Sequence, residues 1–217
     1  MEFSELMSAL CSGALLTLQV FIIALPCSLV LGILITLAVR SRIAPLRWFF
    51  NAYIYVLRGT PLLLQMLFLF YGLYYIPVIG PSIAFQDRMT ACCVAFILNY
   101  AAYFAEIFRG GLLAVDPGQY EAAKVLGLNK VQTFWHVVCP QMFRVALPSL
   151  GNETITLVKD TSLIFCLGLH ELLQNATNLV NTYADFTPYL YCAVFYLILT
   201  TIPTILIRRL EKRFNFQ

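Results

Sequence analysis

The feature that most limits how this chain can fold is a long stretch without charge. Residues Gly13 to Val39 contain no acidic or basic side chain, and a helix needs about 20 mainly apolar residues to cross the hydrocarbon core of a membrane. The rest of the chain has the same character, because 60% of its 217 residues are hydrophobic and only 12% are charged, against about 25% in soluble domains. We therefore predict an all-α integral membrane protein.

Four further stretches resemble membrane spans in length or composition. We predict one transmembrane domain, residues 1–217, with five spans at about 13–39, 48–76, 89–109, 145–168 and 187–208. The second span is split by the run Arg58 to Pro61, so we expect an elbow before its core. Between the fourth and fifth spans, apolar residues recur at helical spacing, which predicts a short helix on the outer surface.

Basic side chains are distributed unevenly around these spans. All but three of the 14 Lys and Arg residues would lie on one side of a five-span chain, and cytoplasmic loops carry the excess of positive charge. We therefore predict an N-terminus outside, a cytoplasmic C-terminus and a cytoplasmic loop at about 110–144. The net charge of +3 is too small to indicate a nucleic-acid partner.

The predicted cytoplasmic loop has its own helix signals. Asp116 and Pro117 are typical of a helix start, and Gly127 is typical of a helix end. A second helical stretch should begin at Lys130 and be interrupted at Pro140. The two helical stretches, residues 116–140, would form a compact, partly apolar knob in water. Such a knob predicts a docking surface, and a solvated helical connector is the alternative.

The same loop carries a family resemblance. Glu121-Ala122-Ala123, Gly127 and Pro140 resemble the EAA loop of ATP-binding-cassette (ABC) importer permeases, with Val137 and Cys139 in place of that motif's Ile and Leu. Further segments resemble the polar amino acid branch of this family, which includes histidine, arginine, glutamine and cystine types. These segments are RGTPLLLQ from Arg58, NYAAYFAEIFRGG from Asn99, DPGQYEAA from Asp116, and the run from Pro148 through LGNE to KDTSL at Lys159 to Leu163.

The resemblance covers nearly the whole chain and implies a fold and a set of partners. It implies a type I ABC importer permease in the bacterial inner membrane, with the EAA segment as a coupling helix that docks on a cytoplasmic ATPase dimer. It also implies a second permease chain, identical or similar, and an extracytoplasmic amino-acid-binding protein. Because the chain lacks the G-x-x-x-x-G-K-[ST] phosphate loop, we expect no enzyme activity and no bound cofactor here, with ATP and Mg on the partner.

Polar side chains at membrane depth mark the candidate substrate site, because such groups are costly in lipid. Asn99, Tyr103 and Glu106 fall on one helical face. Glu153 would suit an ammonium or a cationic side chain, and Arg58 would suit a carboxylate. The candidate substrate-binding residues are Arg58, Thr60, Gln65, Asn99, Tyr103, Glu153 and Thr161.

Two alternatives to this substrate site stay open. The charged groups could satisfy one another, Arg58 with Glu106 or Lys159 with a carboxylate. The chain could also be an ion-coupled carrier or channel subunit for small polar solutes, which would explain the intramembrane charges but not the cytoplasmic knob. An intramembrane enzyme or metal site is disfavoured, because neither a G-x-S-x-G stretch nor a His cluster is present. The sequence leaves the substrate open among glutamine, cystine, arginine, histidine and lysine.

Overall fold

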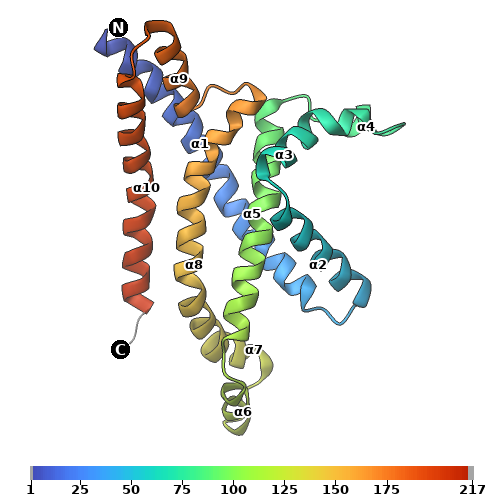
Figure 1. The fold of residues 1–217 in the computed structure, drawn as a ribbon. Helices are drawn as coiled ribbons and strands as arrows, with labels where there is room; N and C mark the ends of the chain where they lie inside the picture. The colour runs from blue at the N-terminus through green and yellow to red at the C-terminus, as the bar shows by residue number, and fades with distance from the viewer. Residues whose placement is uncertain (1, 215–217) are drawn as a thin grey trace.

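Every regular element in residues 2–214, the part of the chain that the computed structural model describes, is a helix. The all-helical prediction is therefore confirmed. Long helices form the body of the molecule, and α1 begins and α10 ends at opposite ends of it (Figure 1). These long helices are α1 (Phe3–Val39), α5 (Arg88–Leu113), α8 (Cys139–Asp160) and α10 (Thr187–Phe214).

The centre of the molecule is the contact between α1 and α5, where small residues let two backbones approach closely. A Cβ on Gly32 would lie 3.2 Å from the carbonyl oxygen of Ala101, and Ala101 and Ala105 are fully buried. Thr36 donates a hydrogen bond across the interface to the Ala105 carbonyl oxygen at 3.1 Å. Small residues and interhelical hydrogen bonds of this kind hold helices together in lipid, where apolar side chains gain little by leaving the solvent.

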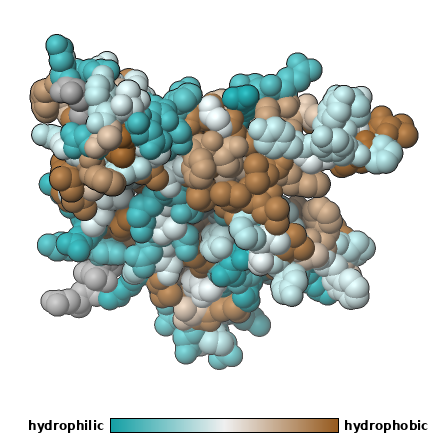
Figure 2. Space-filling model, turned by 45° about the horizontal axis from the view of Figure 1, so that its top comes forward, coloured by the Kyte–Doolittle hydropathy of each residue, from teal (hydrophilic) through white to brown (hydrophobic). Residues whose placement is uncertain are grey.

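By length and composition, α1, α5 and α10 can each cross a membrane, and the bent pair of α2 (Ala44–Gly59) and the segment Leu62–Tyr75, which begins with α3 (Leu62–Leu67), can make a fourth span. The first helix begins at Phe3, earlier than the predicted boundary. Helix α8 carries four charged residues, Arg144, Glu153, Lys159 and Asp160. Its composition alone therefore does not identify it as a membrane span. The count of five therefore stays a prediction. Hydrophobic residues gather over the middle of one face, with hydrophilic residues at its upper and lower ends (Figure 2).

The predicted elbow is present at the run Arg58 to Pro61. The axes of the two segments differ by 110°, because proline disfavours helical geometry in the residue before it, and Thr60 is extended with φ −122° and ψ 147°. After the bend, α3 continues through η1 (Phe68–Gly72) and η2 (Leu73–Tyr75) to the short helix α4 (Gly80–Ile83). Residues 48–76 are thus not one straight helix, and residues 62–83 after the bend form an arm at the side of the molecule (Figure 1).

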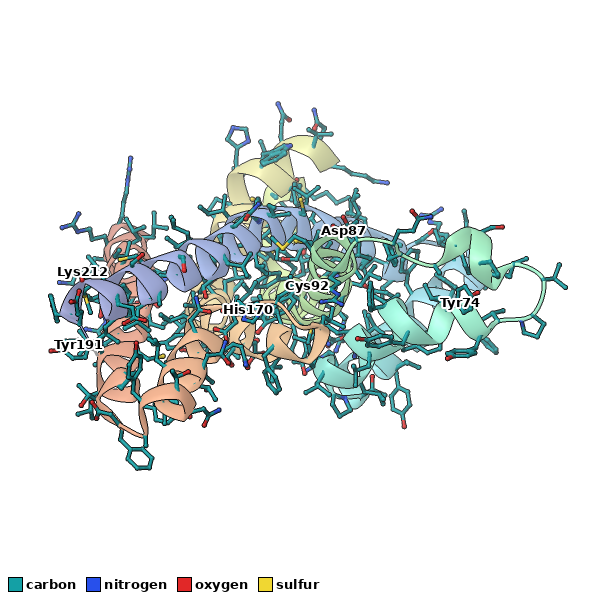
Figure 3. The ribbon with its side chains drawn as sticks, turned by 90° about the horizontal axis from the view of Figure 1, so that it is seen from above. Tyr74, Asp87, Cys92, His170, Tyr191 and Lys212 are labelled. Atoms are coloured by element: carbon teal, nitrogen blue, oxygen red, sulfur yellow. The ribbon has the colours of Figure 1, made fainter. Side chains whose placement is uncertain are left out.

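Figure 3 shows the spread of the molecule from above. Tyr74 lies on this arm at one side, Tyr191 of α10 lies at the other, and Cys92 of α5 lies between them. Both α2 and the arm expose large apolar side chains, among them Trp48 and Tyr55 on α2 and Tyr75 on the arm. Such exposure is expected of residues that face lipid or a second chain.

The predicted outer helix is α9 (Leu172–Tyr183). Most of its apolar side chains do not face outward: Leu172, Ala176 and Leu179 are buried in a cluster with residues of α1 and α10, and Leu173 is exposed. The carboxylate of Glu171, which is fully buried, caps the helix by accepting hydrogen bonds from Leu173 N at 2.7 Å and Gln174 N at 2.6 Å. Burial raises the pKa of Glu171, and these backbone donors act in the opposite direction.

Replacing Gly13 with valine should loosen the contact between α1 and α9. A Cβ at this position would lie 2.7 Å from the Cα of Leu172, so one of the two backbones must move. We expect a loss of about 1–3 kcal/mol of stability, typical of overpacking, seen as a lower melting temperature in detergent. Leu15→Val, at an exposed position of the same helix, is the control. Equal melting temperatures for the two variants would contradict this contact.

Candidate functional site

Three of the predicted substrate-binding residues meet at the elbow and bond to one another. The Gln65 amide nitrogen donates to the Thr60 hydroxyl at 2.8 Å and to the Leu57 carbonyl at 2.9 Å. The Asn99 amide nitrogen donates to the same Leu57 carbonyl and to the Gln65 side-chain oxygen, both at 3.0 Å. Because a broken helix leaves carbonyl oxygens without partners, this network supplies the donors that the end of α2 needs.

Replacing Asn99 with alanine should therefore destabilise the elbow. Asn99 is 4% exposed, and its loss leaves the Gln65 side-chain oxygen without its donor, while the Leu57 carbonyl keeps only the bond from Gln65. An unsatisfied buried polar group costs about 1–3 kcal/mol, so the melting temperature should fall. Asn51→Ala is the matched control, because the Asn51 amide nitrogen donates to the Arg47 carbonyl at 2.8 Å in exposed surroundings. A melting temperature as high as that of the control would show that the network does not support the fold.

The charged residues next to the elbow form a second cluster. The Glu106 carboxylate accepts a bidentate pair of hydrogen bonds from the Arg109 guanidinium, the shorter at 2.6 Å. A guanidinium nitrogen of Arg58 lies 3.9 Å from the same carboxylate. The Arg58 guanidinium carbon also stands 5.2 Å from the centre of the Tyr103 ring, a cation–π arrangement. The alternative pairing of Arg58 with Glu106 is thus present. Arg109 was not among the predicted residues, although its i, i+3 spacing from Glu106 is a pattern that favours pairing.

Glu153 joins this cluster across a cavity between α2, α5 and α8. The cavity has a volume of about 340 Å³ and is lined by Arg58, Tyr103, Glu106 and Glu153 together with small and apolar side chains, including Ser149. A neighbouring hollow of about 450 Å³ shares Arg58, Tyr103 and Glu106. Three of the seven candidate residues therefore line one open space of a size that suits a small solute. Ser149 was not among the predicted residues, because a single serine within a helix gives no sequence signal of a binding site.

Thr161, the remaining candidate, lies apart from this cavity. It is fully buried in η4 (Thr161–Leu167), and its hydroxyl donates to the Val158 carbonyl at 2.7 Å. The adjacent Asp160 accepts a hydrogen bond from the Tyr100 hydroxyl at 2.7 Å. Both side chains are engaged within the protein, on the α8 side of the core.

The predicted coupling loop contains α6 (Pro117–Val125), whose ends are built as the sequence indicates. Asp116 caps its start by accepting from Gly118 N at 2.6 Å. At its end Gly127 has a left-handed φ of +74°, and two backbone bonds close the turn: Leu128 N to Ala123 O and Gly127 N to Lys124 O, both at 3.0 Å. This pair of bonds defines a Schellman motif, so the predicted start and end are confirmed.

The surface of α6 presents the residues that the motif singled out. Glu121 and Ala122 are exposed, whereas Ala123 is buried against the rest of the loop. Exposed apolar side chains surround them, and Leu126 and Val131 are 77% and 66% exposed. The knob therefore offers a small, partly apolar surface with one acidic side chain at its edge.

The predicted interruption at Pro140 is wrong. Helix α7 (Lys130–Thr133) passes through a π-helical turn, η3 (Phe134–Val138), directly into α8, and Pro140 lies in the first turn of α8. The π-helical turn accommodates the proline, because the Cys139 N–H already donates to the Phe134 carbonyl five residues back, so the hydrogen-bond register has shifted where Pro140, which has no N–H, enters the helix. The change in geometry falls before Pro140, and a bond of 3.1 Å from Gln141 to Gln119 ties α8 to the knob.

The fold and this site define a membrane transport subunit: a helical body, a cavity with charged walls at one side, and a knob held beyond the membrane helices. Residues 14–216 match the family described as binding-protein-dependent transport system inner membrane component. The chain belongs to this family. Its predicted resemblance to ABC importer permeases and the predicted fold type are confirmed.

Individual relatives agree with this assignment. The chain is similar to the L-cystine transport system permease protein TcyB of Bacillus subtilis, with 33% identity over 208 residues, 95% of this chain and 86% of TcyB. It is also similar to the putative glutamine transport system permease protein GlnP of Rickettsia bellii, with 35% identity over 213 residues, 98% of this chain and 95% of GlnP. A crystal structure of an amino acid ABC transporter with histidines matches with a TM-score of 0.85 and 33% identity, covering 98% of this chain and 99% of that chain.

Proposed function

We propose that this chain is the permease subunit of an ATP-driven importer for a polar L-amino acid. The similarity to permeases named for cystine and glutamine transport supports the substrate class. The observation that carries the proposal is the cavity of Arg58, Tyr103, Glu106 and Glu153, because it combines acidic, basic and aromatic groups in one space. A zwitterionic solute needs both signs of charge to replace its hydration.

The exposed surface of α6 supports a role for this helix in coupling the permease to an ATPase. A cytoplasmic ATPase dimer, which would hold the ATP and Mg, docks on the segment of Glu121, Ala122 and Ala123 in this proposal. The small, exposed side chain of Ala122 permits close approach, whereas Ala123 is buried, and the Schellman turn at Gly127 fixes the direction of α6. The bond between Gln119 and Gln141 gives α6 a direct connection to α8, so a movement of the knob would be carried to a wall of the cavity.

A second permease chain, identical or similar, completes the pathway in this proposal. The cavity is open, and α2 and the arm beside it expose large apolar side chains. An extracytoplasmic binding protein delivers the amino acid to the outer end. ATP closes the ATPases, the knobs move together, and the helices rock between inward and outward openings around the cavity.

The test is uptake into vesicles. The chain, reconstituted with its ATPase and binding protein, should accumulate a polar amino acid only when ATP is supplied on the ATPase side. The control replaces ATP with a non-hydrolysable analogue. Uptake that continues without the ATPase, or that follows an ion gradient instead of ATP, would support the ion-coupled carrier and overturn the proposal.

The proposed orientation has its own test. With the N-terminus outside, the loop with Arg42 and the knob with Lys124 face the cytoplasm, as the distribution of basic residues requires. A cysteine introduced at Lys124, which is exposed, in a variant depleted of the native cysteines should resist a membrane-impermeant thiol reagent in whole cells. It should react after the cells are broken. Reaction in intact cells would reverse the topology.

A further inference from the structure

A large groove lies beside the knob, separate from the cavity at the elbow. It has a volume of about 780 Å³, and it lies where the end of α1 meets α5, α6 and α7. The walls and floor are mainly apolar. They include Leu37, Leu112, Leu128, Phe134 and Val138.

Three cations line the same groove, and each comes from a different element. Arg40 follows the end of α1, Lys124 belongs to α6, and Lys130 begins α7. All three are exposed. The lining contains no carboxylate, so the groove combines an apolar floor with a positive rim. That combination suits an amphiphilic anion better than a sugar or a free phosphate, neither of which would use the apolar floor.

The position of the groove narrows the choice of ligand. The two Trp residues of the chain, Trp48 at the start of α2 and Trp135 in η3, are 75% and 62% exposed. Trp is enriched where protein crosses the boundary between lipid and water. Trp135 adjoins Phe134, which lines the groove, and their ring centres are 5.3 Å apart. In the proposed orientation, this exposed tryptophan indicates a groove close to the membrane boundary, on the side that carries the basic loops.

We propose that this groove binds an anionic phospholipid of the cytoplasmic leaflet. The phosphate of the headgroup lies among Arg40, Lys124 and Lys130, and an acyl chain lies along the floor beside Leu37 and Phe134. The proposal rests on the cytoplasmic orientation given above, which cysteine labelling tests independently. Because Lys124 and Lys130 flank the Schellman turn of the knob, the lipid would link membrane composition to the position of α6.

Binding is tested first by native mass spectrometry of the purified chain titrated with phosphatidylglycerol or phosphatidylcholine. Phosphatidylglycerol should bind more tightly. Removing one basic contact near an anionic headgroup weakens binding about fivefold, so Arg40→Gln/Lys124→Gln/Lys130→Gln should weaken it about a hundredfold. Arg208→Gln/Arg209→Gln/Lys212→Gln, which removes three exposed cations from α10, is the matched control. Equal affinity for the two lipids, or an equal loss in both variants, would overturn the proposal.

The occupant is identified by crosslinking in the assembled transporter. Phe134→p-benzoyl-phenylalanine places a photoreactive group in the groove, in complexes with the ATPase in vesicles that contain phosphatidylglycerol. Irradiation should add the mass of phosphatidylglycerol to the permease, and the triple variant should lose this adduct. An adduct with the ATPase would show that the protein partner covers the groove, and adducts with phosphatidylglycerol and phosphatidylcholine in proportion to their share of mixed vesicles would show an unselective lipid contact. Either result would overturn the proposal.

Discussion

Gly127→Val should leave the permease inserted in the membrane but separate it from its ATPase, so that ATP-dependent uptake falls to background. Gly127 has a φ of +74°, a region that a β-branched residue avoids. A Cβ at this position would meet no atom within 4 Å, so the strain comes from the backbone and not from crowding. To relieve it, the chain must give up the two bonds of the Schellman turn, and α6 then loses its direction. The measurements are ATPase co-purification and uptake.

The control for this variant is Gly127→Asn, because asparagine tolerates left-handed geometry better than other residues with a side chain. The asparagine variant should keep most of the uptake and of the co-purification. Both variants should melt at similar temperatures, since the turn lies in an exposed loop. Full uptake and normal co-purification in the valine variant would reject the docking role of α6.

The features of the fold that could be predicted are those set by local chemistry. The cap at Asp116, the turn at Gly127 and the elbow before Pro61 each follow from one residue type with restricted backbone geometry. The apolar spacing in residues 172–183 also predicted α9, although the helix buries its apolar face against α1 and α10 instead of lying on the surface. Spacing identifies which residues share a face, but the packing partner depends on residues far away in the chain.

The same limit applies to the candidate site. The sequence places Asn99 and Tyr103 on one face of α5, but it does not show that the Asn99 amide bonds to the elbow while Tyr103 lines the cavity. The path of the chain at Pro140 shows a second limit. A proline normally interrupts a helix, yet the π-helical turn before it leaves the helix continuous, and no residue pattern in the loop indicates such a turn.

Glu153→Gln should weaken the transport of a cationic amino acid about ten- to a hundredfold while sparing a neutral one. Within residues 2–214, the ion pairs below 4 Å join Glu106 to Arg109 and Arg58, and none involves Glu153. Glu153 is therefore the carboxylate of the cavity that is free to meet a substrate cation. Losing one charge-assisted contact costs about 1.5–3 kcal/mol, which corresponds to that range of affinity. Glutamine keeps the shape of the side chain, so the fold should be unaffected.

Two measurements separate this role from a structural one, namely uptake of one cationic and one neutral amino acid, and the melting temperature in detergent. Glu211→Gln, on α10 and away from the cavity lining, controls for the loss of one negative charge. If Glu153 instead balances Arg58 within the protein, its replacement leaves a cation without compensation. The melting temperature and the uptake of both substrates would then fall together. Unchanged uptake of both substrates would remove Glu153 from the site, and the charge that meets the substrate would then have to come from the cluster at Glu106.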